Sequence, residues 1–186
     1  GGNLFSYIHL PKKIDLYEPS RNLFLNLKKS FKKYKKVNFF NKTFNKSKKK
    51  YSSILYLDVL EHIKNDKSEI TKAFKSLKKG GHLIINVPAF SYLYSNFDKD
   101  VGHFRRYSKS DFMKILENLN FKETNFVYYD SIGFFLSLLS KLLVSNYKRN
   151  FDKKIKFWDS LIWISRIIDL IFFRSFGKSL LVIIKK

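Results

Sequence analysis

Two stretches of this chain bring together side chains that can exchange protons or bind anions. The first is Asp58-Val59-Leu60-Glu61-His62, which follows an apolar run, and the second is the segment 98–107, which ends in Arg105-Arg106-Tyr107. A well-placed carboxylate or imidazole can act as a general base, and imidazole titrates near neutral pH. Two adjacent guanidinium groups can form bidentate contacts with a phosphate or a carboxylate. The residue types therefore indicate proton transfer beside a site for an anionic group.

Strands and helices that alternate along the chain must position these stretches. Apolar periodicity predicts strands over 14–18, 37–40, 53–57, 82–87, 122–129 and 179–184, and helices over 22–34, 66–77, 132–144, 158–173 and after Ser108. This alternation is typical of βαβ units in a mainly parallel sheet. In such sheets ligands bind beyond the carboxyl ends of the strands, which is where both stretches fall.

Local signals predict how several elements begin, end and pack. The run 53–57 is apolar without alternation, which is typical of a strand buried on both faces. Gly80-Gly81 is expected to end the helix 66–77. Ser20 is a plausible N-cap, and Ser108 with Asp111 has the spacing of a capping box at the start of a helix.

The beginning of the chain carries a weaker signal for nucleotide binding. Gly1 and Gly2 could let a backbone approach a ligand, and Glu18 ends the strand that follows. An acidic residue about 20 residues after such glycines accepts hydrogen bonds from ribose hydroxyls. The alternative is that Glu18, which precedes Pro19-Ser20, is a turn residue.

Taken in this order, the segments resemble the later part of a class I S-adenosylmethionine-dependent methyltransferase of the small-molecule type. Residues 98–107 match the Asp-x-x-x-Gly-His-x-Arg-Arg-Tyr pattern of one subgroup. The resemblance implies an α/β Rossmann-like sheet that is mostly parallel with an antiparallel last strand. It also implies a single methyltransferase domain over 1–186, a helical insertion or lid over 131–178, and an N-terminal truncation that removes the first strand.

The resemblance also assigns roles to residues, with S-adenosylmethionine as the cofactor. It implies cofactor binding by Gly1, Gly2, Glu18, Thr43, Asp58, Val59, Leu60 and Glu61, candidate catalytic bases at His62 and His103, and acceptor binding by Arg105, Arg106 and Tyr107. Alternatives remain for several of these residues. Thr43 can belong to a plain polar loop, Glu61 and His62 can hold their loop by structural hydrogen bonds, and the arginine pair can fasten its loop to Asp98 and the sheet.

The reaction implied is methyl transfer to an unidentified small-molecule or lipid-linked acceptor. The arginine pair indicates that this acceptor carries a negative charge. The four histidines show no metal-ligand spacing and the chain has no cysteine, so no metal site is expected. The net charge of +22 keeps an RNA methyltransferase as an alternative. However, Asp58-Val59-Leu60-Glu61 stands where a base-methylation motif would lie, so we do not expect nucleic acid as the partner.

A third alternative is a non-catalytic relative of the fold, or a protein that binds a membrane surface. No run of 18 or more apolar residues occurs in the sequence, so no membrane-spanning helix is predicted. The apolar helices of the insertion, interrupted by Lys141, Arg166 and Arg174, are compatible with peripheral contact at the inner membrane surface of a cytoplasmic protein. The oligomeric state is not indicated by the sequence.

Overall fold

The computed structural model describes residues 13–45, 49–142 and 163–186. The chain divides into two compact units, Gly1–Lys46 and Ser47–Lys186, and each is described by itself below. A single domain over 1–186 stays a prediction.

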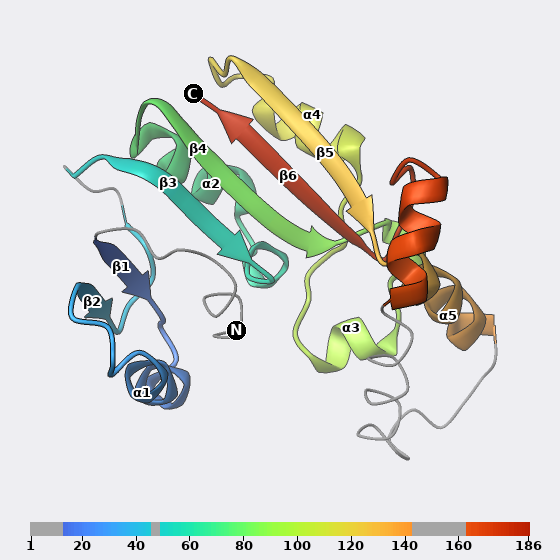
Figure 1. The fold of residues 1–186 in the computed structure, drawn as a ribbon, viewed down its shortest axis with the longest axis horizontal. Helices are drawn as coiled ribbons and strands as arrows, with labels where there is room; N and C mark the ends of the chain where they lie inside the picture. The colour runs from blue at the N-terminus through green and yellow to red at the C-terminus, as the bar shows by residue number, and fades with distance from the viewer. Residues whose placement is uncertain (1–12, 46–48, 143–162) are drawn as a thin grey trace. The chain divides into compact units, whose positions relative to one another are not determined.

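The first unit contains one βαβ arrangement. Strand β1 (Ile14–Tyr17) pairs in parallel with β2 (Val37–Phe40), and helix α1 (Arg21–Ser30) connects them (Figure 1). Ser20 is the N-cap residue of α1, as predicted, although its side chain makes no capping hydrogen bond. The helix ends at Ser30, four residues before the predicted end.

The second unit contains a four-stranded sheet with the order β3-β4-β6-β5. Its strands are β3 (Tyr51–Leu57), β4 (Leu77–Pro88), β5 (Glu123–Tyr129) and β6 (Ser179–Lys185). Strand β3 runs parallel to β4, while β6 is antiparallel to both β4 and β5. The arrowheads of β3, β4 and β5 therefore point one way and that of β6 the other (Figure 1). The α/β class and the antiparallel last strand are confirmed.

The core lies between this sheet and two helices, α2 (Asp66–Lys75) and α4 (Lys109–Leu116), which are both behind the sheet in Figure 1. Alternate residues of the central strands are fully buried, as the two-residue period of a strand requires. They are Leu83, Ile85 and Val87 of β4 and Leu180, Val182 and Ile184 of β6. Each such side chain contributes about 1.5–3 kcal/mol when it leaves water.

The prediction that Gly80-Gly81 ends a helix is wrong. Helix α2 ends at Lys75, and Ser76 caps it with its N–H directed at carbonyl oxygens of the last turn. The two glycines instead lie in β4, where its register with β3 shifts between the pairs Tyr51–Leu77 and Ser53–His82. Gly80 has a φ of 75°, a conformation that glycine adopts without strain. The glycines therefore allow an irregularity in a strand.

The burial predicted for residues 53–57 is also wrong. Within β3 only Tyr56 is buried, and Leu55 is 40% exposed. Strand β3 forms hydrogen bonds with β4 on one side, and no strand among the described residues pairs with its other side. An apolar sequence predicts the strand, but its neighbours decide its burial.

Short helices and the predicted insertion lie in the connections between the strands of this sheet. They are the 3-10 helices η2 (Leu60–His62) and η3 (Ser91–Leu93), α3 (Asn96–Asp100), α5 (Ser131–Leu142) and a helical segment over 163–171. The buried carboxylate of Asp169 accepts hydrogen bonds from the N–H groups of Asp130 and Ser131, at 3.0 and 2.9 Å. These bonds join segment 163–171 to the start of α5. The rest of the predicted insertion, 143–162, lies outside the described residues.

No helix of the described ranges has both the length and the apolar character that a bilayer span needs.

Candidate active site

The carboxyl ends of β3, β4 and β5 lie at the same edge of the second unit's sheet, because these strands run in one direction. Polar side chains form a continuous hydrogen-bonded row there. Asn86 donates its Nδ2 to Asp58 Oδ1 at 2.8 Å, and Tyr129 donates its hydroxyl to Asn86 Oδ1 at 2.8 Å. Asp58 itself has a φ of 54°, a left-handed conformation that Asp tolerates better than most residues. This edge is where α/β sheets bind ligands.

Glu61 lies just beyond this row, in η2, and its side chain is buried. Its exposed fraction is 1%, and its Oε2 has no hydrogen-bond partner. The pKa of Glu61 is raised to about 7. Burial is the main cause and the carboxylates of Asp58 and Asp98 act in the same direction, while a backbone hydrogen bond and Arg106 oppose them. A buried carboxyl group that titrates near neutrality is a feature of functional sites.

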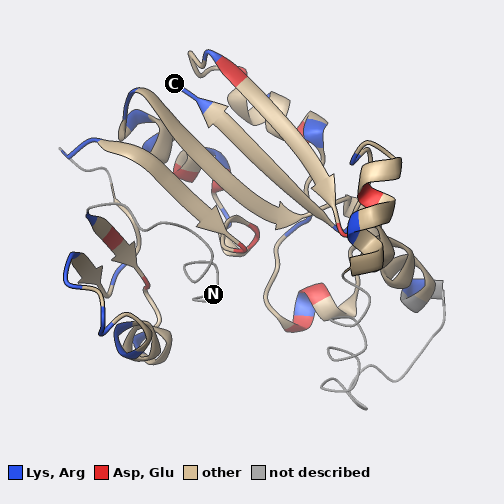
Figure 2. Ribbon diagram, in the orientation of Figure 1, with Lys and Arg blue, Asp and Glu red and all other residues tan. Residues whose placement is uncertain are grey.

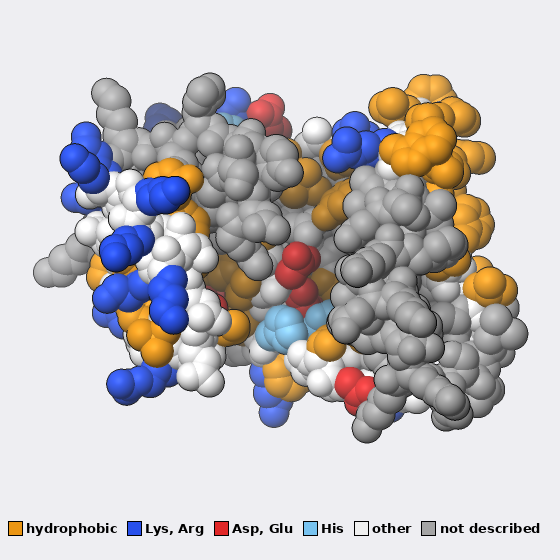
Figure 3. Space-filling model, turned by 60° about the horizontal axis from the view of Figure 1, so that its bottom comes forward, with side chains coloured by type: hydrophobic (Ala, Val, Ile, Leu, Met, Phe, Trp, Pro, Cys, Tyr) orange, Lys and Arg blue, Asp and Glu red, His pale blue; other side chains and the backbone are white. Residues whose placement is uncertain are grey.

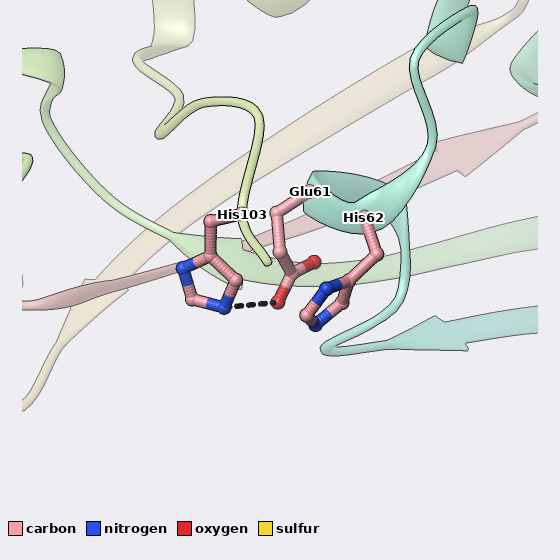
Figure 4. A group of neighbouring side chains, drawn as sticks. All are labelled: Glu61, His62 and His103. Carbon is pink, nitrogen blue, oxygen red and sulfur yellow. Dashed lines mark ion pairs between the residues drawn. The ribbon is translucent and has the colours of Figure 1, made fainter. Parts of the chain in front are cut away.

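Two histidines flank Glu61 (Figure 4). His103 Nε2 lies 3.8 Å from Glu61 Oε1, and the rings of His62 and His103 meet edge to face with centroids 4.8 Å apart. His62 Nδ1 is 3.1 Å from the carbonyl oxygen of Gly102. The two histidines are 41 positions apart in the sequence, and the loop after α3 brings them together.

Asp98 fixes the orientation of His103. Its carboxylate is fully buried and lies 2.8 Å from His103 Nδ1 and 2.8 Å from the Nε of Arg106, which donates to it. It also accepts the N–H of Ser95 at 2.9 Å, as part of the capping box of α3. Burial alone would raise the pKa of Asp98, but these hydrogen bonds outweigh burial and hold it below its usual value. The carboxylate therefore stays ionised and accepts a hydrogen bond from the Nδ1–H of His103.

The sequence Arg105-Arg106-Tyr107 is bonded within the protein. Arg105 donates to Asp66 Oδ2 at 2.7 Å and to the carbonyl of Lys64 at 2.8 Å. Arg106, which is 5% exposed, pairs with Asp98 and reaches the carbonyl of Ala89 at 3.3 Å. The Tyr107 hydroxyl donates to Asp66 at 2.8 Å, and burial raises its pKa. These bonds match the alternative in which the motif fastens its loop, and Arg105 is the more exposed of the two arginines.

The other predicted cofactor residues have varied surroundings. At the end of β3, Asp58 is exposed, Val59 is 42% exposed and the Leu60 side chain is fully buried. Glu18 follows β1 in the first unit, where its carboxylate accepts the N–H of Ser20 at 2.8 Å. Thr43 is exposed in the loop after β2. Gly1 and Gly2 lie outside the described residues.

Three residues near this edge were not singled out from the sequence. Asn86 and Tyr129 belong to the polar row, and Lys178 precedes β6. Burial lowers the pKa of Lys178, while the carboxylates of Asp130, Asp98 and Asp58 act against that change. A polar residue inside the apolar run Ile84–Val87 was a usable signal for Asn86, because it interrupts a buried strand two residues before its end.

Comparison with known proteins identifies the family. A family model described as a methyltransferase domain matches residues 2–124. No curated protein sequence matches the chain.

Solved structures share the fold at low sequence identity. A candidate methyltransferase from Bacillus halodurans has a TM-score of 0.60 and 16% identity over 94% of this chain and 83% of that one. A SAM-dependent methyltransferase from Archaeoglobus fulgidus has a TM-score of 0.51 and 17% identity over 99% and 90%. Phosphoethanolamine N-methyltransferase 2 from Haemonchus contortus, in complex with S-adenosyl-L-methionine, has a TM-score of 0.56 and 14% identity over 94% and 43%.

The fold and the family match define a class I, Rossmann-like methyltransferase. The chain belongs to the methyltransferase-domain family. The family predicted from the sequence is thereby confirmed, and with it the class of enzyme, the S-adenosylmethionine-dependent methyltransferases.

Proposed function

We propose that this protein transfers the methyl group of S-adenosylmethionine to a small-molecule or lipid-linked acceptor that binds against Glu61, His62 and His103. The observation that carries the proposal is the buried Glu61 carboxyl group, with one partnerless oxygen, beside two histidines at the ligand-binding edge of the sheet. Perturbed titratable groups that gather at such an edge are typical of a catalytic site.

The charge of the residues at the end of β3 is complementary to that of the cofactor. Asp58 offers an exposed carboxylate and Val59 an exposed apolar side chain. A carboxylate can accept hydrogen bonds from an ammonium group and attracts a positively charged sulfonium. When bound, the cofactor supplies an electrophilic methyl group, whose bond to sulfur breaks with its electrons left on sulfur. Glu18 and Thr43, in the first unit, stay proposed contacts for the ribose and the adenine.

The acceptor must lose a proton if its nucleophilic atom arrives protonated. His103 is suited to receive it, because Asp98 holds its Nδ1 and leaves its Nε2 lone pair directed toward Glu61. His62 is the more exposed of the two rings and lies nearer to solvent. Both histidines are therefore proposed to act on the acceptor.

The surroundings favour an acceptor with an apolar or aromatic part. Phe90, which follows β4, stacks on Tyr128 of β5 with centroids 4.8 Å apart and lies 5.7 Å from Phe134 of α5. Tyr92 joins this aromatic cluster and is 51% exposed. An anionic acceptor, inferred from the arginine pair, has less support because both guanidinium groups already bind carboxylates.

Calorimetric titration of S-adenosylhomocysteine into the full chain tests the proposal. We expect saturable binding that weakens about tenfold or more in Asp58→Asn and in Glu18→Ala, since each loses a charged hydrogen-bond acceptor. Glu123→Gln, at the opposite end of β5, is the matched control and should bind as the wild type does.

Transfer is then measured with methyl-labelled S-adenosylmethionine and a panel of small and lipid-linked acceptors. Methylation of one acceptor, reduced in His103→Ala, would support the proposal. Binding without transfer to any acceptor would favour the non-catalytic alternative, and transfer to RNA would favour the RNA methyltransferase.

A further inference from the structure

Glu61, His62 and His103 form a group that can hold a metal ion. One ligand-capable atom from each side chain lies within 4.8 Å of the others, and this is the only such group of three among the described residues. Figure 4 shows the Glu61 carboxylate between the two imidazole rings, with η2 providing two of the ligands and the loop after α3 the third. Two imidazoles and a carboxylate are a ligand set that proteins use for divalent transition metals.

Both histidines are oriented as metal ligands usually are. The carbonyl oxygen of Gly102 can only accept a hydrogen bond, so His62 Nδ1 must carry the hydrogen in their 3.1 Å contact. Asp98 Oδ1, which also accepts the Nε–H of Arg106, lies 2.8 Å from His103 Nδ1 and likewise places the hydrogen on that nitrogen. In neutral imidazoles this leaves both Nε2 atoms with a lone pair. Metal-binding histidines generally donate their second ring nitrogen to a carbonyl or a carboxylate in this way.

Glu61 supplies an independent sign of a missing partner. Its side chain is 1% exposed, yet Oε2 makes no hydrogen bond. A buried polar atom without a partner destabilises the folded state, and a charged one does so more strongly.

We propose that Glu61, His62 and His103 bind one divalent transition-metal ion, of which zinc is the best fit. This inference rests on the proposed function for the identity of the site's acceptor, but the metal site itself does not require it. Two imidazole nitrogens favour zinc over magnesium, which prefers oxygen ligands. Ligand atoms around tetrahedral zinc are about 3.4 Å apart, so ligand atoms that now lie within 4.8 Å of one another must approach by up to about 1.4 Å.

Three protein ligands leave a fourth position of a tetrahedral ion open, as in catalytic zinc sites. The group is accessible from the side of His62, which is exposed, whereas the His103 side chain is 12% exposed. Histidine side chains are visible at the surface in Figure 3, with acidic side chains beside them. An acceptor oxygen or nitrogen that binds the open position would lose its proton to solvent more readily, because a metal ion lowers the pKa of its ligands. The metal would then replace His103 as the means of activating the acceptor.

The test is a zinc titration of the chelator-treated full chain, in competition with a chromophoric chelator. We expect one equivalent to bind and His62→Ala to weaken binding at least tenfold. His62 is exposed, so its removal should leave the fold intact, which circular dichroism can verify. His82→Ala is the matched control, because His82 lies in the middle of β4, where it pairs with Ser53 near the start of β3, and is not part of the group of three. Cobalt substitution gives a second readout, as a tetrahedral site produces visible absorption that the His62→Ala protein should lack.

Absence of stoichiometric binding, or equal affinity in the wild type, His62→Ala and Glu61→Gln, would overturn the metal site. Titration of S-adenosylhomocysteine in the same preparations separates the two proposals. Cofactor binding without metal binding would refute the metal site and leave the proposed function standing. Metal binding without cofactor binding would refute the proposed function and leave the metal site standing.

Discussion

Glu61 and Asp98 show at the scale of single residues that burial alone does not decide the charge of a carboxyl group. Both side chains are almost inaccessible to solvent, with exposed fractions of 1% and 0%. Burial raises the pKa of Glu61 to about 7, whereas hydrogen bonds from His103 and Arg106 reverse the effect of burial on Asp98. Asp98 is an ionised anchor, and Glu61 is poised to gain or lose a proton.

The pH dependence of stability should report on Glu61 in metal-free protein. Its pKa is about 7 in the folded protein, against the ordinary value of 4.5 for a glutamate in water, so the folded state binds the proton more tightly. The associated stabilisation is complete below about pH 4.5 and is lost as the pH rises through 7, which lowers the free energy of unfolding by up to about 3 kcal/mol. Urea unfolding between pH 5 and pH 8 measures this. Glu61→Gln should lack this component, and equal pH profiles of the two proteins would contradict the prediction.

Replacement of Asp98 should destabilise the protein strongly. Asp98→Asn leaves the buried guanidinium of Arg106, 3% exposed, without its anion and also weakens the bond to His103. Removal of one partner of a buried ion pair lowers the free energy of unfolding by about 3–5 kcal/mol. Denaturant unfolding measures the loss, with Glu123→Gln as the control because the exposed pair Lys185–Glu123 should be worth less than about 1 kcal/mol. A loss as small as that of the control would show that Asp98 does not anchor the loop.

At the scale of elements, the loop 101–108 depends on fixed points at both ends. Its start follows α3, whose capping box uses Asp98, and its end is Ser108, the N-cap of α4. Between them, the N–H of Phe104 donates to the carbonyl of Glu61 at 2.8 Å, and Arg105 and Tyr107 share Asp66. The motif 98–107 therefore holds His103 beside η2.

The capping box of α4 makes a separate contribution. Ser108 Oγ accepts the N–H of Asp111, and Asp111 accepts the N–H of Ser108 at 2.8 Å. Ser108→Ala should cost about 1 kcal/mol of stability, because one helix N–H loses its acceptor. Thermal or urea unfolding measures the change. Lys114→Ala, exposed on the same helix, should stay within about 0.5 kcal/mol of the wild type, and equal effects would contradict a specific role of the cap.

For the whole molecule, the dominant property is the net charge of +22. Lys and Arg are distributed over the elements of both units in Figure 2 and do not gather on one helix or strand. A diffuse positive charge attracts polyanions without selecting among them.

RNA binding should therefore be weak, unspecific and sensitive to salt. We expect the affinity for a labelled RNA oligomer to fall about tenfold or more between roughly 50 and 200 mM salt, because such binding depends on counterion release. Fluorescence anisotropy with two unrelated RNA sequences measures it. Strong preference for one sequence that persists at the higher salt would contradict this prediction and favour an RNA substrate.

The sequence alone determined the class of fold, the family, most elements and the cap at Ser108. These features depend on local periodicity and on short motifs, and both are formed by residues that are close together in the sequence. The two helices of the insertion were likewise expected from their apolar faces, and α5 lies within two residues of its predicted bounds.

Only the tertiary structure decided the burial of β3, the use of Gly80-Gly81 in a strand and the surroundings of the site. The grouping of Glu61 and His62 with His103 depends on a loop fastened by Asp98 and Asp66, and histidine spacing along the chain gave no sign of it. Asn86 and Tyr129 join Asp58 for the same reason, since strands β3, β4 and β5 end together. Contacts between residues tens of positions apart arise from tertiary packing, and local sequence patterns do not predict them.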